Sequence, residues 1–191
     1  MYDFICIERE YGSGGHSIAE KLAKRLNFDL NDHSVVVETC KRMGLSYDMV
    51  SQMDEQNPIK PIFKSKEMDG HLSLEDQIYN TEVAVIQEAA EKGKGIFVGR
   101  SAGEILKDKN CLKVFICADK GFRYDRTLNV ENIDPDKAES VMQKFDKRRE
   151  RFFTTHSGAK WGSSDYFDLV LNSGHLGIDT CVDILENLAK K

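Results

Sequence analysis

Residues 4–17 read FICIEREYGSGGHS, and this stretch decides the fold. It begins with Phe4–Ile7, a short and nearly continuous apolar run of the kind that forms a parallel strand covered on both faces. Glycines follow at positions 12, 14 and 15, and a helical pattern comes directly after them. Glycines let backbone N–H groups converge on an anion, and the N-terminus of the next helix adds partial positive charge. The order strand, glycine loop, helix therefore predicts a phosphate-binding loop in preference to a plain tight turn.

The glycine loop fits the Walker pattern G-x-x-x-x-G-K-[ST] only in part. With Gly14 as the last glycine of the pattern, Arg9 stands at the first glycine position and Gly15 at the lysine position. The lysine that bridges the terminal phosphates is missing, and His16 or arginines of a later lid are the candidates to replace it. If one of them occupies its space, Gly15→Lys alone rescues nothing. The dinucleotide pattern G-x-G-x-x-G matches at two glycines but has serine in place of the third, so a Rossmann site is the weaker interpretation.

Ser17 has two interpretations. Residues 17–20, SIAE, have the form of a capping box, in which the hydroxyl only caps the helix. In a phosphate loop the same hydroxyl reaches Mg²⁺, and Ser17 falls where the G-K-G-T variant has its threonine. An acidic partner for the metal is not singled out, since four acidic residues lie near the ends of expected strands: Glu8, Glu10, Asp32 and Asp119.

Three further apolar runs are expected to form strands: residues 96–98, 112–117 and 169–171. Helical periodicity lies between the strands: residues 16–26, 34–43, 74–92 and 178–189. SAGE at 101–104 has the form of a capping box opening a short helix. Strands alternating with helices predict a doubly wound α/β fold with a parallel sheet.

Two regions have less regular patterns, residues 54–72 and 129–165. The first holds two of the three prolines and is expected to be a surface excursion. The second contains a long charged stretch and then SGAKWGSS at 157–164, and it is expected to form a lid. Trp161 in that stretch is expected to be a packing residue at the base of the lid.

Arginines follow two of the expected strands and fill the charged stretch. Arg100 comes directly after a strand, at the sheet edge where α/β proteins bind ligands, and its planar fork matches a phosphate. Arg123 and Arg126 share one helix face, so either an anion between them relieves their repulsion or the face is a solvated basic surface. Asp146 and Arg149 have the i,i+3 spacing of an ion pair that would hold the guanidinium in place. A mixed run of charge is usually a solvated helix, but its position before the Gly/Ser-rich segment favours a phosphate lid.

Composition excludes several classes of protein. The chain has 191 residues, of which 40% are hydrophobic and 31% charged, with a net charge of −5; these values suit one folded domain without a global attraction for nucleic acid. No apolar run approaches the roughly 20 residues that span a membrane, and the first residues lack the features of a secretory signal. The 5 histidines show no metal-ligand spacing. The 5 cysteines include no C-x-x-C pair, and their use is typical of a protein from a reducing, cytoplasmic compartment.

The ordered set of motifs resembles the cytidylate kinase-like family, a branch of the P-loop nucleoside monophosphate kinases. The matching pieces cover nearly the whole chain in order: REYGSGG at 9–15, Asp32, VGR at 98–100, the Arg123/Arg126 helix, DKRR at 146–149, WG at 161–162 and YFDLVLNS at 166–173. The resemblance implies one P-loop kinase-like domain over residues 1–191, with an acceptor-binding excursion at about 32–75 and a helical lid at about 126–163. The resemblance also implies that a glycine in place of the Walker lysine is a common feature of this branch of the family. Val98 and Ser101 stand where true cytidylate kinases have two aspartates.

The resemblance also implies roles for individual residues. ATP phosphates would lie on Gly12, Ser13, Gly14, Gly15, His16 and Ser17, with Mg²⁺ at Ser17. Asp32 and Arg100 would bind the acceptor. The catalytic set would be Arg123, Arg126 and Arg149, closing over the transferred group, together with Asp146. Phosphoryl transfer is catalysed by positioning and charge neutralisation, and one well-placed arginine is worth roughly 10³–10⁵ in rate.

Three hypotheses follow. The first is an ATP- and Mg²⁺-dependent phosphotransferase acting on a small acceptor, most readily a nucleoside monophosphate such as CMP. The second is a nucleotide-binding module with weak or no catalysis, motivated by the missing lysine and the missing aspartate at a strand end. The third is a Rossmann-type oxidoreductase, which ranks last because it gives the basic lid and Arg100 no role.

Overall fold

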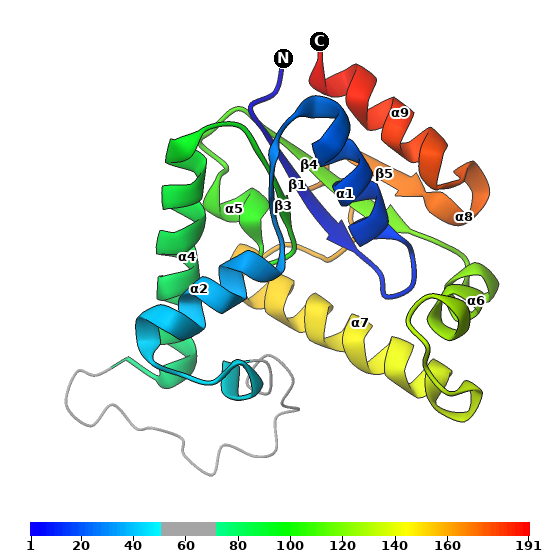
Figure 1. Cartoon of the computed structure of the whole chain (residues 1–191), viewed down its shortest axis with the longest axis horizontal. Helices are drawn as coiled ribbons and strands as arrows, with labels where there is room; N and C mark the ends of the chain where they lie inside the picture. The colour runs from blue at the N-terminus through cyan, green and yellow to red at the C-terminus, as the bar shows by residue number, and fades with distance from the viewer. Residues whose placement is uncertain (51–71) are drawn as a thin grey trace.

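The computed structural model describes residues 1–50 and 72–191 (Figure 1). Its elements follow in the order β1 (Phe4–Arg9), α1 (Gly15–Leu26), β2 (Asp29–Asn31), α2 (His33–Met43), α4 (Leu74–Lys92), β3 (Gly95–Val98), α5 (Ala102–Ile105), β4 (Cys111–Cys117), α6 (Lys120–Asn129), α7 (Pro135–Ser157), β5 (Leu169–Asn172), α8 (Ser173–Leu176) and α9 (Ile178–Ala189). The expected surface excursion at 54–72 lies, except for Leu72, outside the described residues.

The strands form one parallel sheet in the order β2-β3-β1-β4-β5. The predicted α/β fold with a parallel sheet is therefore confirmed. In the classic dinucleotide-binding order, the second strand along the chain lies beside the first. Here β3 separates β1 from β2, so the order is not that of the dinucleotide fold, and the oxidoreductase hypothesis loses its structural basis.

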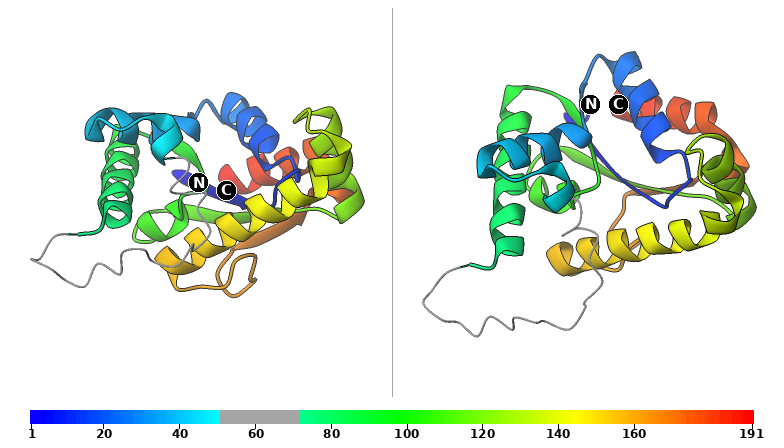
Figure 2. Two further views of the ribbon diagram at one scale, coloured as in Figure 1. Left: turned by 90° about the horizontal axis from the view of Figure 1, so that it is seen from below. Right: turned by 60° about the horizontal axis from the view of Figure 1, so that its bottom comes forward.

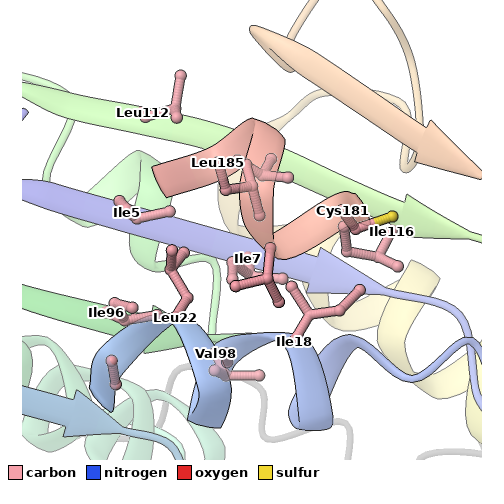
Figure 3. Close-up of a cluster of buried hydrophobic side chains, with 14 of the residues drawn as sticks. Ile5, Ile7, Ile18, Leu22, Ile96, Val98, Leu112, Ile116, Cys181 and Leu185 are labelled. Atoms are coloured by element: carbon pink, nitrogen blue, oxygen red, sulfur yellow. The ribbon is translucent and has the colours of Figure 1, made fainter. Parts of the chain in front are cut away.

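The two faces of the sheet bury alternate residues of β1. Ile5 and Ile7 belong to a buried cluster with Ile18 of α1 and Leu185 of α9, and Figure 3 shows these side chains between the strands and the two helices. Phe4 and Cys6 belong to a second cluster on the other face, with residues of α4 and α5. Burying one aliphatic side chain contributes about 1.5–3 kcal/mol to the free energy of folding. Several buried apolar side chains stabilise each face of the sheet. The sheet is thus covered on both sides, as the continuous apolar runs predict.

The carboxyl ends of the strands form the edge at which polar side chains gather. The glycine loop leaves this edge after β1, Gly99 follows β3 and Asp119 follows β4. Helix α7 crosses below the same edge (Figures 1 and 2). Its Asp146 and Arg149 contact the glycine loop and the end of β1, respectively. The fold therefore brings the charged stretch of the sequence against the loop that the sequence predicts to bind phosphate.

The resemblance implies a helical lid at about 126–163, and most of the less regular region 129–165 is one helix. Residues 135–157 form the continuous helix α7, which begins at Pro135 after the capping side chain of Asp134 and ends at Gly158 with φ +68°. Proline at the first helical position and glycine after the last are ordinary helix boundaries. The high charge of the stretch conceals a sparse apolar set, in which Ala138, Met142 and Phe153 are buried.

Two smaller expectations also differ from the structure. Strand β2 was not predicted, because its three residues Asp29–Asn31 at the sheet edge carry no apolar run. The short helix after Ser101 is present as α5, but the Ser101 side chain makes no capping hydrogen bond. Helices α1, α2, α4 and α9 lie within one residue of the predicted bounds. In the part of the chain that the structure describes, no helix is long and apolar enough to cross a membrane.

Candidate functional site

The glycine loop connects β1 to α1 in a conformation that needs glycine. Gly12 and Gly14 have φ angles of +74° and +79°, in the left-handed region that other residues avoid. Helix α6 packs so closely on the loop that a Cβ at Gly12 would lie 2.6 Å from the carbonyl oxygen of Arg123. A Cβ at Gly14 would overlap Cδ1 of Ile178. Both glycines are thus fixed by backbone angle and by space.

The first turn of α1 leaves backbone donors free beside the loop. Helix α1 begins at Gly15 with Gly14 as its N-cap, so Ser17 lies in the first turn and the capping-box interpretation of Ser17 was wrong. The first N–H groups of a helix have no intrahelical acceptor. Within residues 1–50 and 72–191, no acceptor is bonded to the N–H groups of Gly14, Gly15, His16 and Ser17. Such an unpaired set, at the positive end of a helix dipole, is suited to a phosphate.

Ser13 has a different part in the loop. Its side chain is buried, its hydroxyl and its N–H both donate to the carbonyl oxygen of Glu10, at 2.8 Å and 3.3 Å, and its own carbonyl accepts from the Ser173 hydroxyl at 2.5 Å. These bonds lie inside the protein. Ser13 therefore shapes the loop, and the free donors lie on the residues after it.

The two arginines of α6 both lie against the loop, as their shared helix face predicts. Arg126 Nη2 donates to the Ser17 hydroxyl at 3.2 Å. Arg123 Nη1 donates to the Tyr11 carbonyl at 3.3 Å and to Asp146 Oδ2 at 2.5 Å. Two guanidinium groups thus flank the loop.

The expected ion pair between Asp146 and Arg149 is not formed. Asp146 Oδ1 accepts the Tyr11 N–H at 2.7 Å, and its other oxygen pairs with Arg123. Arg149 Nη1 donates to the carbonyl oxygen of Arg9 at 3.2 Å, and its guanidinium lies 5.6 Å from the Tyr11 ring centroid. Burial lowers the pKa of Arg149 to about 9, and the positive charge of Arg9 acts in the same direction. Arg149 is therefore a partly buried cation whose charge an incoming anion would stabilise.

The His16 ring contacts two carboxylates. Its Nδ1 lies 2.5 Å from Asp32 Oδ2, and its Nε2 lies 3.5 Å from Glu20 Oε1. The ring is thus engaged by two carboxylates. His16 and Arg9 therefore both contact the Asp32 carboxylate, His16 through Oδ2 and Arg9 through Oδ1.

A cavity of about 180 Å³ opens between β1, α2, β3 and α7. We call it the arginine cavity, because four arginines line it: Arg9, Arg100, Arg148 and Arg149. Asp32, Glu8 and the rings of Tyr47, Phe145 and Phe152 complete much of its wall. Both residues that the sequence assigns to the acceptor, Asp32 and Arg100, therefore line one cavity.

Arg100 lines the arginine cavity and is held by a carboxylate and an aromatic ring. It lies beyond β3 with a φ of +60°, and its Nη1 is 3.3 Å from Oε1 of Glu82, a buried residue of α4. Its guanidinium carbon lies 5.5 Å from the Phe152 ring centroid. A carboxylate on one side and an aromatic face on the other orient the planar fork.

The acidic candidates for a metal site are mostly engaged by backbone donors. Glu8 accepts the Ser101 N–H at 3.2 Å, Glu10 accepts the Ala118 N–H at 3.0 Å, and Asp119 caps α6 through the Phe122 N–H at 3.1 Å. Burial raises the pKa of both Glu8 and Glu10. No group of three or more His, Cys, Asp or Glu side chains suited to a metal ion occurs among the described residues. The Ser17 hydroxyl in the first turn of α1 is a group that could hold a magnesium ion whose other ligands are phosphate oxygens.

The sequence reasoning missed part of the site although a signal was present. Phe145, Arg148, Arg149 and Phe152 all line the arginine cavity, and they recur at i, i+3, i+4 and i+7 of α7. That spacing marks one helix face. Extending the i,i+3 reasoning for Asp146 and Arg149 to this face of the helix would have added Arg148 to the site. Trp161 stands where expected as a packing residue, edge-on to the Phe115 ring at 5.0 Å.

The parallel sheet, the glycine loop after its first strand and the basic helix across its carboxyl edge define a fold of the P-loop kinase type. Residues 4–175 match the Cytidylate kinase-like family, and the chain belongs to that family.

Two relatives named cytidylate kinase match nearly the whole chain. One, from Archaeoglobus fulgidus, is 30% identical over 186 residues, which cover 95% of this chain and 91% of the relative. The other, from Thermoplasma acidophilum, is 23% identical over 172 residues, covering 88% and 82%.

Solved structures support the same fold. An uncharacterized protein from Eubacterium ventriosum superposes with a TM-score of 0.76 at 28% identity, covering 98% of each chain. The shikimate kinase of Bacteroides thetaiotaomicron superposes with a TM-score of 0.60 at 14% identity, covering 100% of each chain. At that identity the second likeness concerns the fold alone.

Proposed function

We propose that the protein transfers the γ-phosphoryl group of ATP to a nucleoside monophosphate such as CMP. The observation that carries the proposal is the placement of the arginine cavity beside the free N–H groups of the glycine loop, at one sheet edge. The loop suits the phosphates of a donor, and the cavity suits an anionic acceptor. The two relatives named cytidylate kinase support this substrate class.

The proposed reaction is an in-line transfer between two phosphates. The bond from the γ-phosphorus to the oxygen bridging it to the β-phosphate breaks, and its electron pair stays on ADP. A bond forms from the same phosphorus to an oxygen of the acceptor phosphate. Little covalent help is needed, because positioning and stabilisation of charge supply most of the catalysis.

Each cationic residue of the site has a part in this scheme. Arg123 and Arg126 flank the loop from α6, and Arg149 lies between the loop and the arginine cavity on α7. They are the residues that would contact the transferred group. Asp146 fixes Arg123 and the Tyr11 N–H, so it acts as a positioning residue.

Acceptor and metal have separate places in the proposal. Asp32 and Arg100, which both line the cavity, would orient the acceptor. Mg²⁺, when bound, would offset the charge of the donor phosphates, and the Ser17 hydroxyl in the first turn of α1 would be its protein ligand. Helix α7, within the proposed lid at about 126–163, would keep water from the phosphoryl group.

A second candidate is a nucleotide-binding module with weak or no transfer, which the glycine at position 15 favours. The experiment that separates the two measures ADP release by the purified full chain with ATP, Mg²⁺ and each nucleoside monophosphate in turn. We expect the highest kcat/KM with a pyrimidine monophosphate. A melting temperature that ATP raises, without turnover on any acceptor, would establish the module instead. A melting temperature that no nucleotide changes would contradict both the phosphotransferase and the nucleotide-binding module.

A further inference from the structure

The Arg9 side chain occupies a space that two glycines leave open. A Cβ at Gly15 would lie 2.6 Å from Cβ and 2.9 Å from Cγ of Arg9, well inside van der Waals contact. A Cβ at Gly99 would overlap Nη1 of the same arginine. Gly15 lies in helix α1 without a positive φ, so its backbone angles would accept any residue. Space for the stem of Arg9 is what excludes a side chain at position 15.

Position 15 is also the position of the Walker lysine. A lysine there would place its Cβ against the stem of Arg9. The stem passes Gly15 at the start of α1, and the guanidinium reaches Gly99 beyond β3. Arg9 thus begins at the first position of the Walker pattern and fills the space beside the seventh.

The guanidinium of Arg9 has donors to spare. Its one ion pair within residues 1–50 and 72–191 is a long contact of 3.9 Å to Asp32 Oδ1, and it donates no hydrogen bond there. The side chain is only 17% exposed. A guanidinium carries five N–H donors. One that is largely buried and donates no hydrogen bond among the described residues is suited to an anionic ligand.

Arg9 lies between the two parts of the site. Its backbone belongs to the end of β1, directly before the glycine loop, and its side chain lines the arginine cavity. Its carbonyl oxygen accepts from Arg149, whose guanidinium lines the same cavity. Two cations so placed repel each other, and a phosphate between them would relieve that repulsion.

We propose that Arg9 takes the part of the absent Walker lysine: its guanidinium contacts the phosphate oxygens where the glycine loop meets the arginine cavity, and positions 15 and 99 are glycine to admit it. The inference rests on the proposed function, since the anion is the phosphoryl group passing between two nucleotides. Arg9 keeps its protons throughout the transfer and donates hydrogen bonds to the oxygens that carry the developing charge.

The test compares variants of the full chain. Arg9→Met keeps an unbranched apolar stem beside Gly15 and removes the guanidinium with its charge. Gly15→Lys adds the lysine while Arg9 is present. The exchange variant, Arg9→Gly with Gly15→Lys, restores the Walker order of glycine and lysine. Arg25→Ala is the control, because Arg25 on α1 pairs with Asp183 and Glu186 of α9 and does not line the cavity. For each variant we would measure kcat, KM and the shift in melting temperature that ATP produces.

We expect Arg9→Met to melt near the wild type and to lose roughly 10²-fold or more in kcat, the usual loss for one donor to a transition state. Gly15→Lys should also lose activity, while the exchange variant should exceed it clearly. Arg25→Ala should keep the wild-type kcat. Wild-type kcat in Arg9→Met would overturn the inference. A folded exchange variant no more active than Gly15→Lys would overturn it as well.

Failure of the proposed function would look different. The wild type would then release no ADP with any nucleoside monophosphate. In that case, the shift in melting temperature that ATP produces would test whether Arg9 contacts phosphate. An ATP-induced shift that is present in the wild type and lost in Arg9→Met would support the contact to phosphate. An equal shift in both proteins, or none in either, would overturn it.

Discussion

The Asp146 carboxylate on α7 accepts a hydrogen bond from the backbone N–H of Tyr11, 135 residues earlier in the chain, at 2.7 Å. Its second oxygen accepts from Arg123 of α6 at 2.5 Å. One side chain therefore ties both basic helices to the glycine loop. The rings of Tyr11 and Phe145 stack beside this contact at 4.8 Å, so the junction has a polar and an aromatic part.

Asp146→Ala should destabilise the protein and slow the proposed reaction. The change removes the side-chain acceptor of the Tyr11 N–H and the closest carboxylate partner of Arg123, and a hydrogen bond to a charged group is worth about 1.5–3 kcal/mol. We expect the free energy of unfolding in urea to fall by about that amount. Turnover should fall too, because Arg123 loses the contact that orients it. Glu150→Ala on the exposed side of α7 is the control, and an equal loss in both variants would contradict the role of Asp146.

Gly12→Ala should cost more stability than glycine replacements at similar backbone angles. Gly12 and Gly158 have φ of +74° and +68°, but a Cβ at Gly12 would lie 2.6 Å from a backbone oxygen, whereas nothing lies within 4 Å of one at Gly158. Gly158→Ala should therefore show only the left-handed strain, about 1–2 kcal/mol. Gly12→Ala should exceed it and also weaken ATP binding, since α6 or the loop must move. Thermal unfolding and ATP titration of both variants measure this, and equal losses would show that the close approach of α6 is unimportant.

Much of the fold could be predicted from the sequence because its strong signals are local. The apolar runs at 4–7, 96–98, 112–117 and 169–171 are continuous, and a parallel sheet buried on both faces requires such runs. Strand β2 gave no such signal, since an edge strand of three residues is held by its pairing to β3 more than by its own composition. The charge of the stretch before Gly158 indicates a helix but hides its length, which Asp134, Pro135 and Gly158 mark at both ends.

Only those parts of the site that follow from the order of strands and loops along the chain could be predicted from the sequence. The loop and its neighbouring arginines come together because the carboxyl ends of parallel strands share one edge. The partner of Asp146 was not predictable in this way, because a local i,i+3 spacing favoured Arg149, whereas packing of α7 against the loop brings Asp146 to Tyr11 and Arg123. The path of Arg9 between Gly15 and Gly99 likewise depends on three separate segments meeting.

The pH dependence of stability should reveal the buried carboxyl of Glu8. Burial raises the pKa of Glu8 above its ordinary value of 4.5, so between 4.5 and the raised pKa the folded protein binds more protons than the unfolded chain. The contribution of Glu8 to the free energy of unfolding must then fall as pH rises through that window. Glu8→Gln cannot titrate and keeps an oxygen for the Ser101 N–H. We therefore expect the variant to gain stability relative to the wild type as pH rises through the window, measured by urea unfolding at a series of pH values. A difference that shrinks with rising pH would contradict the burial of the charge.

Ser17 offers a test of the magnesium assignment that is independent of Arg9. Its hydroxyl accepts from Arg126 at 3.2 Å, which leaves the other lone pair free for a metal ion. Ser17→Ala should raise the Mg²⁺ concentration for half-maximal rate roughly 10-fold or more, a loss typical even of groups one shell further from a metal. Ser17→Thr keeps the hydroxyl and should keep the wild-type requirement. Arg126→Met is measured beside these variants. If Ser17→Ala lowers kcat to the same extent as Arg126→Met and leaves the Mg²⁺ requirement unchanged, the hydroxyl serves to hold Arg126, and the metal assignment is wrong.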